Sequence, residues 1–150
     1  MKLYDVSLFP PALLREINQH YGAPVSLKER LFGPPTGSPG MDWISGPPDI
    51  SDIITPLGPR IRLNAERRSK GWLLHINGSL RRFYLVGFEP GELQHWTFES
   101  MPGERFMHVS ICTSGADWTF RLRDSAQKNA LNRFFQALDS PNHSKPISLR

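Results

Sequence analysis

The chain has 150 residues and a net charge of +4, and 39% of its residues are hydrophobic. This length and apolar content predict one folded domain with an ordinary core, and they exclude wholesale disorder. No apolar run approaches the roughly 20 residues that span a bilayer. The first residues lack the apolar stretch of a secretion signal. Because Cys112 is the only cysteine, an intrachain disulfide is excluded, and we expect a cytoplasmic protein.

Residues 1–32 have the pattern of two short amphipathic helices. Pro11 suits the first turn of a helix, where no amide donor is needed, and Gly22 can end that helix in a left-handed conformation. A capping box begins the second helix at Ser26, and Gly33 follows its last turn. We expect the two helices to cover one end of a sheet, with binding to a partner as the alternative.

Residues 33–59 contain seven prolines and five glycines, a composition that excludes a regular helix or a central strand. Large apolar residues are nevertheless spaced through the segment, among them Trp43 and Ile44. A free linker would be polar, so we interpret the segment as an extended wrap that buries its apolar residues. The alternative is a proline-stiffened motif that presents Trp43 and Ile44 to a partner protein.

From residue 60 onward apolar residues alternate with polar ones, which is the period of β-strands. Six candidate strands span residues 60–64, 72–77, 80–88, 93–99, 106–112 and 118–122. Most are separated by turns of two to five residues, which join antiparallel neighbours, and Asn77-Gly78 is a strong hairpin signal. The last strand leads into an amphipathic helix that begins at Asp124 or Ser125 and ends at Leu138.

These elements predict an α+β fold. A curled antiparallel sheet or half-barrel of about six strands is closed by a C-terminal helix and preceded by an N-terminal helical segment. We expect a single domain over residues 1–150. Its parts are the N-terminal helices (1–32), the Pro/Gly-rich extended segment (33–59), the sheet with its C-terminal helix (60–138) and a tail (139–150).

Three passages between about residues 71 and 138 resemble a pleckstrin-homology domain. Gly71-Trp72-Leu73-Leu74 resembles its first strand, and the runs from Arg81 to Val86 and from Glu92 to Trp96 resemble its second and third strands. The run from Phe120 to Leu138 resembles the last strand and closing helix, with Phe134 where the family usually has tryptophan. The chain has fewer strands than the family. The resemblance implies a non-catalytic scaffold that binds another molecule, commonly a protein.

The resemblance does not extend to a phosphoinositide site. Arg82 fits the family's pattern of basic residues on the first two strands, but His75 and Leu80 stand where two more basic residues are wanted. We therefore do not expect binding to phosphoinositide membranes.

Positive charge is concentrated after residue 59. Residues 1–59 carry four Lys or Arg against six Asp or Glu, and residues 60–150 carry fourteen against eight. The basic residues of a candidate binding patch are Arg60, Arg62, Arg67, Arg68, Lys70, Arg81, Arg82, Arg121 and Arg123. Such a patch beside aromatic residues could bind the phosphates and bases of a nucleic acid, or an acidic protein surface. The remaining alternative is a solvated basic surface.

Chemically reactive residues give a weaker signal. His75, His95 and His108, together with Cys112, fall on the strand face opposite the aromatic residues, where strand pairing could bring three imidazoles to one metal ion. No paired metal motif, nucleophile elbow or phosphate-binding glycine loop is present in the sequence. We expect Cys112 to be a small packing residue and assign no catalytic residue and no cofactor.

The sequence thus predicts a non-catalytic binding module, a protein–protein interaction or adaptor subunit. Nucleic-acid binding through the basic residues 60–82 is the alternative, and a histidine-ligated metal site is a weaker one.

Overall fold

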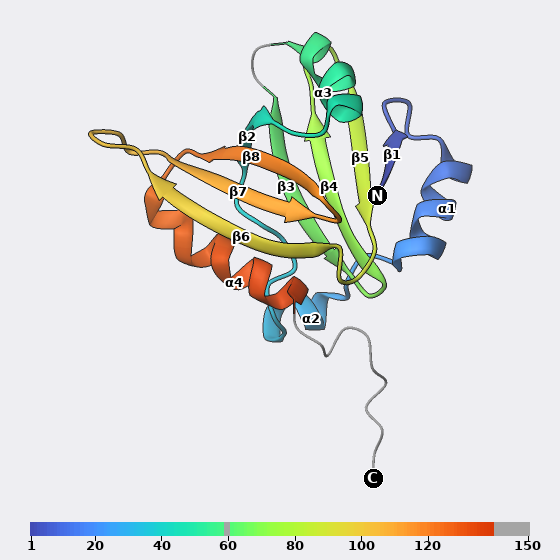
Figure 1. Ribbon diagram of the computed structural model, residues 1–150. Coiled ribbons are helices and arrows are strands. Elements are labelled where there is room, and N and C mark those ends of the chain that lie inside the picture. Colours follow the sequence, from blue (N-terminus) through green and yellow to red (C-terminus); the bar gives the residue numbers. More distant parts are fainter. Residues whose placement is uncertain (59–60, 140–150) are drawn as a thin grey trace.

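Eight antiparallel strands form one sheet in the computed structural model, which describes residues 1–58 and 61–139 (Figure 1). The spatial order is β1-β5-β4-β3-β2-β8-β7-β6. The strands are β1 (Lys2–Asp5), β2 (Met41–Ser45), β3 (Arg62–Arg68), β4 (Gly71–Asn77), β5 (Phe83–Phe88), β6 (Leu93–Ser100), β7 (Met107–Thr113) and β8 (Ala116–Leu122). The antiparallel pairing predicted from the short turns is confirmed for β3–β4, β4–β5, β6–β7 and β7–β8. It is wrong for β5 and β6, which a short turn also joins but which lie far apart in the sheet. The outer strands β1 and β6 are not hydrogen-bonded to each other, so the sheet is open.

The expected half-barrel of about six strands closed by a helix is therefore wrong. Two further strands come from segments in which no strand was predicted. β1 precedes the first helix and pairs with β5, with Leu3 opposite Val86. Four residues are too few for a period of two to stand out from chance, so only the long-range partner defines this strand.

β2 lies in the middle of the sheet, although it belongs to the Pro/Gly-rich segment. Met41 pairs with Leu63 on β3 and with Leu122 on β8. The five residues of β2 include no proline or glycine, so each can contribute its amide hydrogen to the sheet. The prediction that residues 33–59 exclude a central strand and a helix is wrong, because prolines act only at the positions they occupy. The same segment also forms a helix that begins at Pro48.

Six helical segments accompany the sheet in the described residues. They are α1 (Pro11–Tyr21), α2 (Leu27–Phe32), α3 (Pro48–Ile54), the 3-10 turns η1 (Thr55–Leu57) and η2 (Ser125–Gln127), and α4 (Lys128–Asp139). The Ser26 hydroxyl caps α2 by accepting a hydrogen bond from the Glu29 amide, as the capping box predicts. No helix among the described residues is long and apolar enough to cross a membrane.

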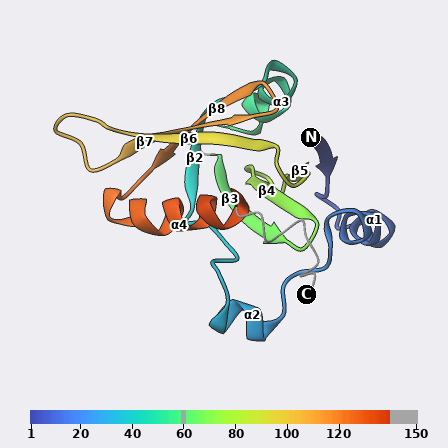
Figure 2. The same ribbon diagram turned by 60° about the horizontal axis from the view of Figure 1, so that its bottom comes forward.

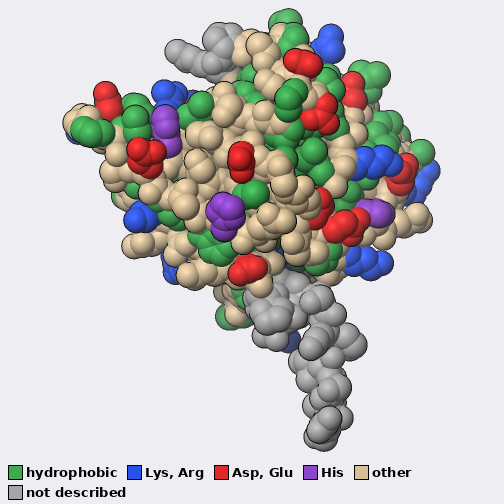
Figure 3. Space-filling model, in the orientation of Figure 1, with side chains coloured by type: hydrophobic (Ala, Val, Ile, Leu, Met, Phe, Trp, Pro, Cys, Tyr) green, Lys and Arg blue, Asp and Glu red, His purple; other side chains and the backbone are tan. Residues whose placement is uncertain are grey.

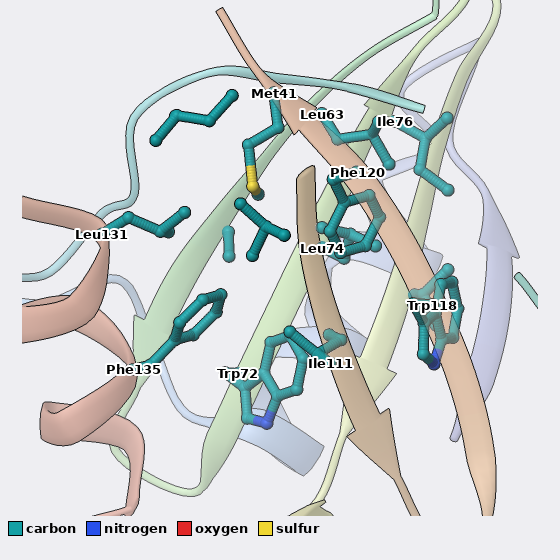
Figure 4. Packing of buried hydrophobic residues seen from close by; sticks show 14 of the residues in the cluster. Met41, Leu63, Trp72, Leu74, Ile76, Ile111, Trp118, Phe120, Leu131 and Phe135 are labelled. Carbon is teal, nitrogen blue, oxygen red and sulfur yellow. The ribbon is translucent and has the colours of Figure 1, made fainter. Parts of the chain in front are cut away.

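The main core lies inside the curl of the sheet, where α3 and α4 pack against it (Figures 1 and 4). Trp72 and Phe88 stack with ring centroids 3.9 Å apart, and Phe135 of α4 packs on Trp96 of β6. Figure 4 shows Leu131 and Phe135 pointing from α4 toward the strands. Burial of these aromatic rings is the main force that holds α4 to the sheet.

A second, smaller core holds α1 on the outer face of β4, β5 and β1. Ile17 and Tyr21 of α1 are buried against Leu73 and Leu85. Leu73 and its neighbour Leu74 point to opposite faces of β4 and are both buried, so this part of the sheet is covered on both sides. Figure 2 shows α1 beside the strands and α2 standing apart from them.

Candidate binding surface

Several of the predicted site residues meet at a polar hollow where β7, β8 and β2 adjoin. Arg121 on β8 pairs with Asp42 on β2 and with His108 on β7. The side chains of these three paired residues point to the face of the sheet opposite the core. They surround a hollow of about 590 Å³, which we call the arginine hollow, lined by Asp42, Trp43, Ile44, Ile61, Phe106, His108, Arg121 and Arg123.

Asp42 lies at the centre of the arginine hollow and is only 8% exposed. Arg123 donates from Nη2 to Oδ1 at 2.8 Å and from Nε to Oδ2 at 2.9 Å. Arg121 donates from Nη2 to Oδ2 at 3.0 Å and from Nε to the same oxygen at 3.3 Å. The hydrogen bonds from Arg123 and then Arg121, outweighing burial, hold the pKa of Asp42 below its ordinary value.

This arrangement carries a net positive charge, because two guanidinium groups share one carboxylate. Both arginine side chains remain nearly half exposed, and their hydrogen bonds to Asp42 use Nε and Nη2. The Nη1 atom of each arginine is therefore available to a second acceptor.

Apolar and aromatic side chains form the walls of the arginine hollow. The Arg121 guanidinium lies over the Phe106 ring at 5.3 Å from its centroid, and Phe106 stacks on His108 at 6.1 Å. Trp43 is half-buried, with its ring edge-on to Trp118 at 6.0 Å. Ile44 is 40% exposed. The hollow can thus accept an anionic group together with an apolar one.

The structure brings together residues that the sequence predicted for two different sites. Trp43 and Ile44 were expected to face a partner protein, and Arg121 and Arg123 were expected to belong to a basic patch. The register between β2 and β8 places all four around the same hollow. The pairing joins residues about 80 positions apart in the chain, which no local pattern reveals.

Of the other predicted basic residues, Arg62 adjoins the arginine hollow, and the rest of those described lie elsewhere. Arg62 is exposed on β3, opposite Asp42, and lines a small neighbouring hollow with Arg123. Arg81 and Arg82 are exposed in the turn between β4 and β5, and Lys70 is exposed at the opposite end of β4. Arg60 lies outside the described residues.

Two of the predicted basic residues, Arg67 and Arg68, are buried and bound to other parts of the chain. Arg67 donates from Nε to the Pro35 carbonyl at 3.1 Å, and burial lowers its pKa. Arg68 donates from Nη1 to the Gly22 carbonyl at 2.8 Å and forms an ion pair with Glu66. Both guanidinium groups therefore have a structural role.

The histidines do not gather at one point. His75 lies on β4, bonded to Glu66 at 2.9 Å, whereas His95 and His108 lie on β6 and β7, beyond β3, β2 and β8. Within residues 1–58 and 61–139, no three His, Cys, Asp or Glu side chains are grouped closely enough to hold a metal ion. The Cys112 thiol is buried and donates to Gln94 Oε1 at 3.4 Å. Figure 3 shows histidines and charges of both signs scattered over this face of β6–β8.

Asp42, Ile61 and Phe106 are the residues of the arginine hollow that sequence reasoning missed. A signal for Asp42 exists in the run Met41-Asp-Trp-Ile-Ser45, where it alternates with two large apolar residues as in a strand. Comparison with known protein families and with curated proteins gave no match to this chain. Function is therefore inferred from the geometry of the site.

Proposed function

We propose that this chain is a non-catalytic protein-binding module, an assembly or adaptor subunit, and that the arginine hollow binds an acidic segment of the partner protein. The observation that carries the proposal is the convergence of Arg121 and Arg123 with apolar walls that are partly exposed. The resemblance to pleckstrin-homology domains supports it as an analogy to a family of binding scaffolds.

The chemistry of the hollow selects the ligand class. A carboxylate of the partner accepts hydrogen bonds from the Nη1 atoms that the pairing with Asp42 leaves available. An aliphatic or aromatic side chain beside that carboxylate packs on Ile44 and Phe106. Asp42 offsets the repulsion between the two guanidinium groups, and the remaining net positive charge of the cluster disfavours binding of a cation. A segment that alternates acidic and apolar residues satisfies all of these features.

The position of the arginines favours protein over nucleic acid as the ligand. In the basic stretch proposed for nucleic acid, Arg67 and Arg68 are buried, and the exposed Lys70 and Arg81 lie at opposite ends of β4. Tracking a phosphate backbone needs a continuous row of accessible cations. The arginine hollow instead offers a short cationic site with apolar walls, which suits a few side chains of a folded or extended protein segment.

A peptide array tests this proposal. Immobilised short peptides would vary independently in their number of carboxylates and of aliphatic or aromatic residues, and the purified chain would be titrated over them. We expect binding to require both residue classes and to weaken with salt. The variant Asp42→Asn/Arg121→Gln/Arg123→Gln replaces the charges by neutral hydrogen-bonding groups and should lose binding. Ile44→Ser should weaken it through loss of an apolar contact.

Arg133→Gln is the matched control, because it removes one positive charge from an exposed position on α4, as the triple variant does in net terms. It should bind like the parent chain. Equal binding of acidic and neutral peptides, or acidic binding that survives the triple variant, contradicts the proposal. A single-stranded oligonucleotide that binds through the same arginines, with affinity falling steeply with salt, would assign the surface to nucleic acid.

A further inference from the structure

The most exposed large apolar side chains of the described residues lie in two places. Leu27, Leu31 and Phe32 are 71%, 66% and 84% exposed on α2. Leu8, Phe9 and Leu80 are 92%, 60% and 92% exposed at the loop after β1 and the turn after β4. Monomeric proteins rarely leave such groups of apolar side chains in water, so both surfaces call for a partner.

α2 is held away from the sheet by contacts at both of its ends. It buries none of its own residues. Arg68 binds the Gly22 carbonyl before α2, and Arg67 binds the Pro35 carbonyl after it. The chain then returns to the sheet, where the Thr36 carbonyl accepts a hydrogen bond from the Arg67 amide. The helix is thus a fixed projection rather than a loose loop.

The second surface is concave. Leu8, Phe9, Leu80 and Phe83, with Asp5, Ser7, Arg81 and Arg82, line a hollow of about 630 Å³, which we call the tip hollow. Ser7 ties its two loops together: the Ser7 hydroxyl accepts from the Phe83 amide at 3.0 Å, and the Phe83 carbonyl accepts from the Val6 amide at the same distance. The Phe9 and Phe83 rings lie 5.6 Å apart.

Backbone strain in the described residues is concentrated at the tip hollow. Phe9, Leu80 and Arg81 have φ angles of 48°, 59° and 58°, and Ser114 is the only other non-glycine residue with positive φ in the described chain. Bulky residues rarely adopt this left-handed conformation. Strained positions that also expose apolar side chains are typical of binding surfaces rather than of turns that serve only to connect strands.

We propose that α2 of one copy of this chain docks into the tip hollow of a second copy. Successive residues of a helix are about 100° apart around its axis, so the apolar residues of α2 fall within one arc of about 140°. Glu29 lies about 60° beyond the edge of this arc. In order around the helix these residues are Leu27, Leu31, Lys28, Phe32 and then Glu29. The three apolar side chains fill the apolar part of the tip hollow, Lys28 meets Asp5, and Glu29 meets Arg81 or Arg82 at its rim.

The two surfaces lie at opposite ends of the molecule, with α2 at the bottom of Figure 1 and the β4–β5 turn at the top. One chain therefore cannot satisfy both surfaces by folding back on itself. The contact is heterologous and leaves an unused surface at each end, so copies add head to tail. One short helix buries less area than the roughly 1,200 Å² of a stable complex, so association is weak and depends on concentration.

Sedimentation equilibrium of the purified chain from about 5 to 500 μM tests this proposal, with one variant for each surface. We expect the parent chain to gain mass with concentration. Leu31→Asp places a charge on the apolar face of α2, and Leu80→Asp places a charge in the tip hollow. Each variant alone should remain monomeric. Both residues are highly exposed, so neither change endangers the fold. Gln136→Asp, on the exposed face of α4, adds the same charge elsewhere and should associate like the parent chain.

The decisive sample is an equimolar mixture of Leu31→Asp and Leu80→Asp. Leu80→Asp retains an intact α2, and Leu31→Asp retains an intact tip hollow. The mixture should form a 1:1 dimer and stop there, since the remaining surface of each chain is disabled. A parent chain that stays monomeric at 500 μM overturns the proposal. So does association that survives both substitutions, or a mixture that stays monomeric.

Discussion

Arg67 and Arg68 are adjacent on β3, yet they hold chain segments on either side of α2. Their side chains point to opposite faces of the strand, as the period of two requires. Arg68 reaches back to Gly22 at 2.8 Å, and Arg67 reaches forward to Pro35 at 3.1 Å. Two buried guanidinium groups thus fix where the projecting helix leaves the sheet and where it returns.

Replacing Arg68 should destabilise the whole chain. Arg68→Met leaves the half-buried Glu66 carboxylate with His75 as its remaining side-chain partner, and it leaves the Gly22 carbonyl without this donor. We expect a loss of about 3 kcal/mol in the free energy of unfolding, measured by urea denaturation. Lys70→Met, an exposed neighbour, should change stability by less than about 0.5 kcal/mol. Equal effects of the two changes would show that Arg68 is not structural.

Glu66 should make stability fall in acid. Burial raises its pKa, but the hydrogen bonds from His75 and Arg68 outweigh burial, and the pKa is lowered to about 2 from a usual 4.5. As the pH falls from about 4.5 toward 2, the unfolded chain binds a proton that folded Glu66 does not, so folding loses up to about 3 kcal/mol over that range. The Glu66→Gln variant should have a lower free energy of unfolding at neutral pH, and this free energy should fall less steeply between pH 4.5 and about 2. An unchanged slope contradicts this assignment.

Gly87 gives α1 room to approach the sheet. A Cβ atom at this position would lie 2.2 Å from the Tyr21 side chain, closer than any real contact. Gly87→Ala should therefore displace α1 and cost about 2 kcal/mol of unfolding free energy. In a Tyr21→Leu background the same change should cost less, because the shorter side chain leaves space for the new methyl group. A double-mutant cycle measures this coupling, and additive effects would refute it.

The turn between β4 and β5 should become more stable when its strained residues are replaced. Leu80→Asn with Arg81→Gly supplies residues that adopt positive φ readily, and we expect a gain of about 1 kcal/mol in thermal unfolding. The same double variant removes an apolar wall of the tip hollow, so its self-association should weaken. A variant that is more stable but associates less would show that Leu80 and Arg81 serve self-association and not the stability of the monomer. Loss of stability would show that Leu80 contributes to the fold of the monomer.

Asp42 should compete with an acidic ligand for the guanidinium groups of Arg121 and Arg123. Asp42→Asn removes the charge shared by Arg121 and Arg123, and we expect a stability loss of only about 1 kcal/mol because both arginines are nearly half exposed. Acidic peptides should bind the variant more tightly, since its guanidinium groups have lost a competing carboxylate. Isothermal titration calorimetry against an acidic peptide measures this change. Weaker binding would mean that Asp42 chiefly orients the arginines.

The local sequence pattern was sufficient to locate an element that is long and that pairs with a strand next to it in the sequence. Period-two alternation located β4 to β8, and a capping residue with an apolar stripe located α4. β1 and β2 escaped detection because each has at most five residues and pairs with strands far away in the chain. Proline content also misled the interpretation of residues 33–59, since the prolines flank β2 and lie in the first turn of α3.

The sequence by itself determined the antiparallel pairing of β3–β4, β4–β5, β6–β7 and β7–β8, the amphipathic closing helix and the number of basic residues. It did not show that β5 and β6, joined by a short turn, lie apart in the sheet. It could not decide which arginines are available for binding. Burial of Arg67 and Arg68 depends on carbonyl groups more than 30 residues away, and the cluster around Asp42 depends on pairing across about 80 residues. Only the tertiary structure decided these placements, because the energy of a buried or shared charge depends on the groups that folding brings next to it.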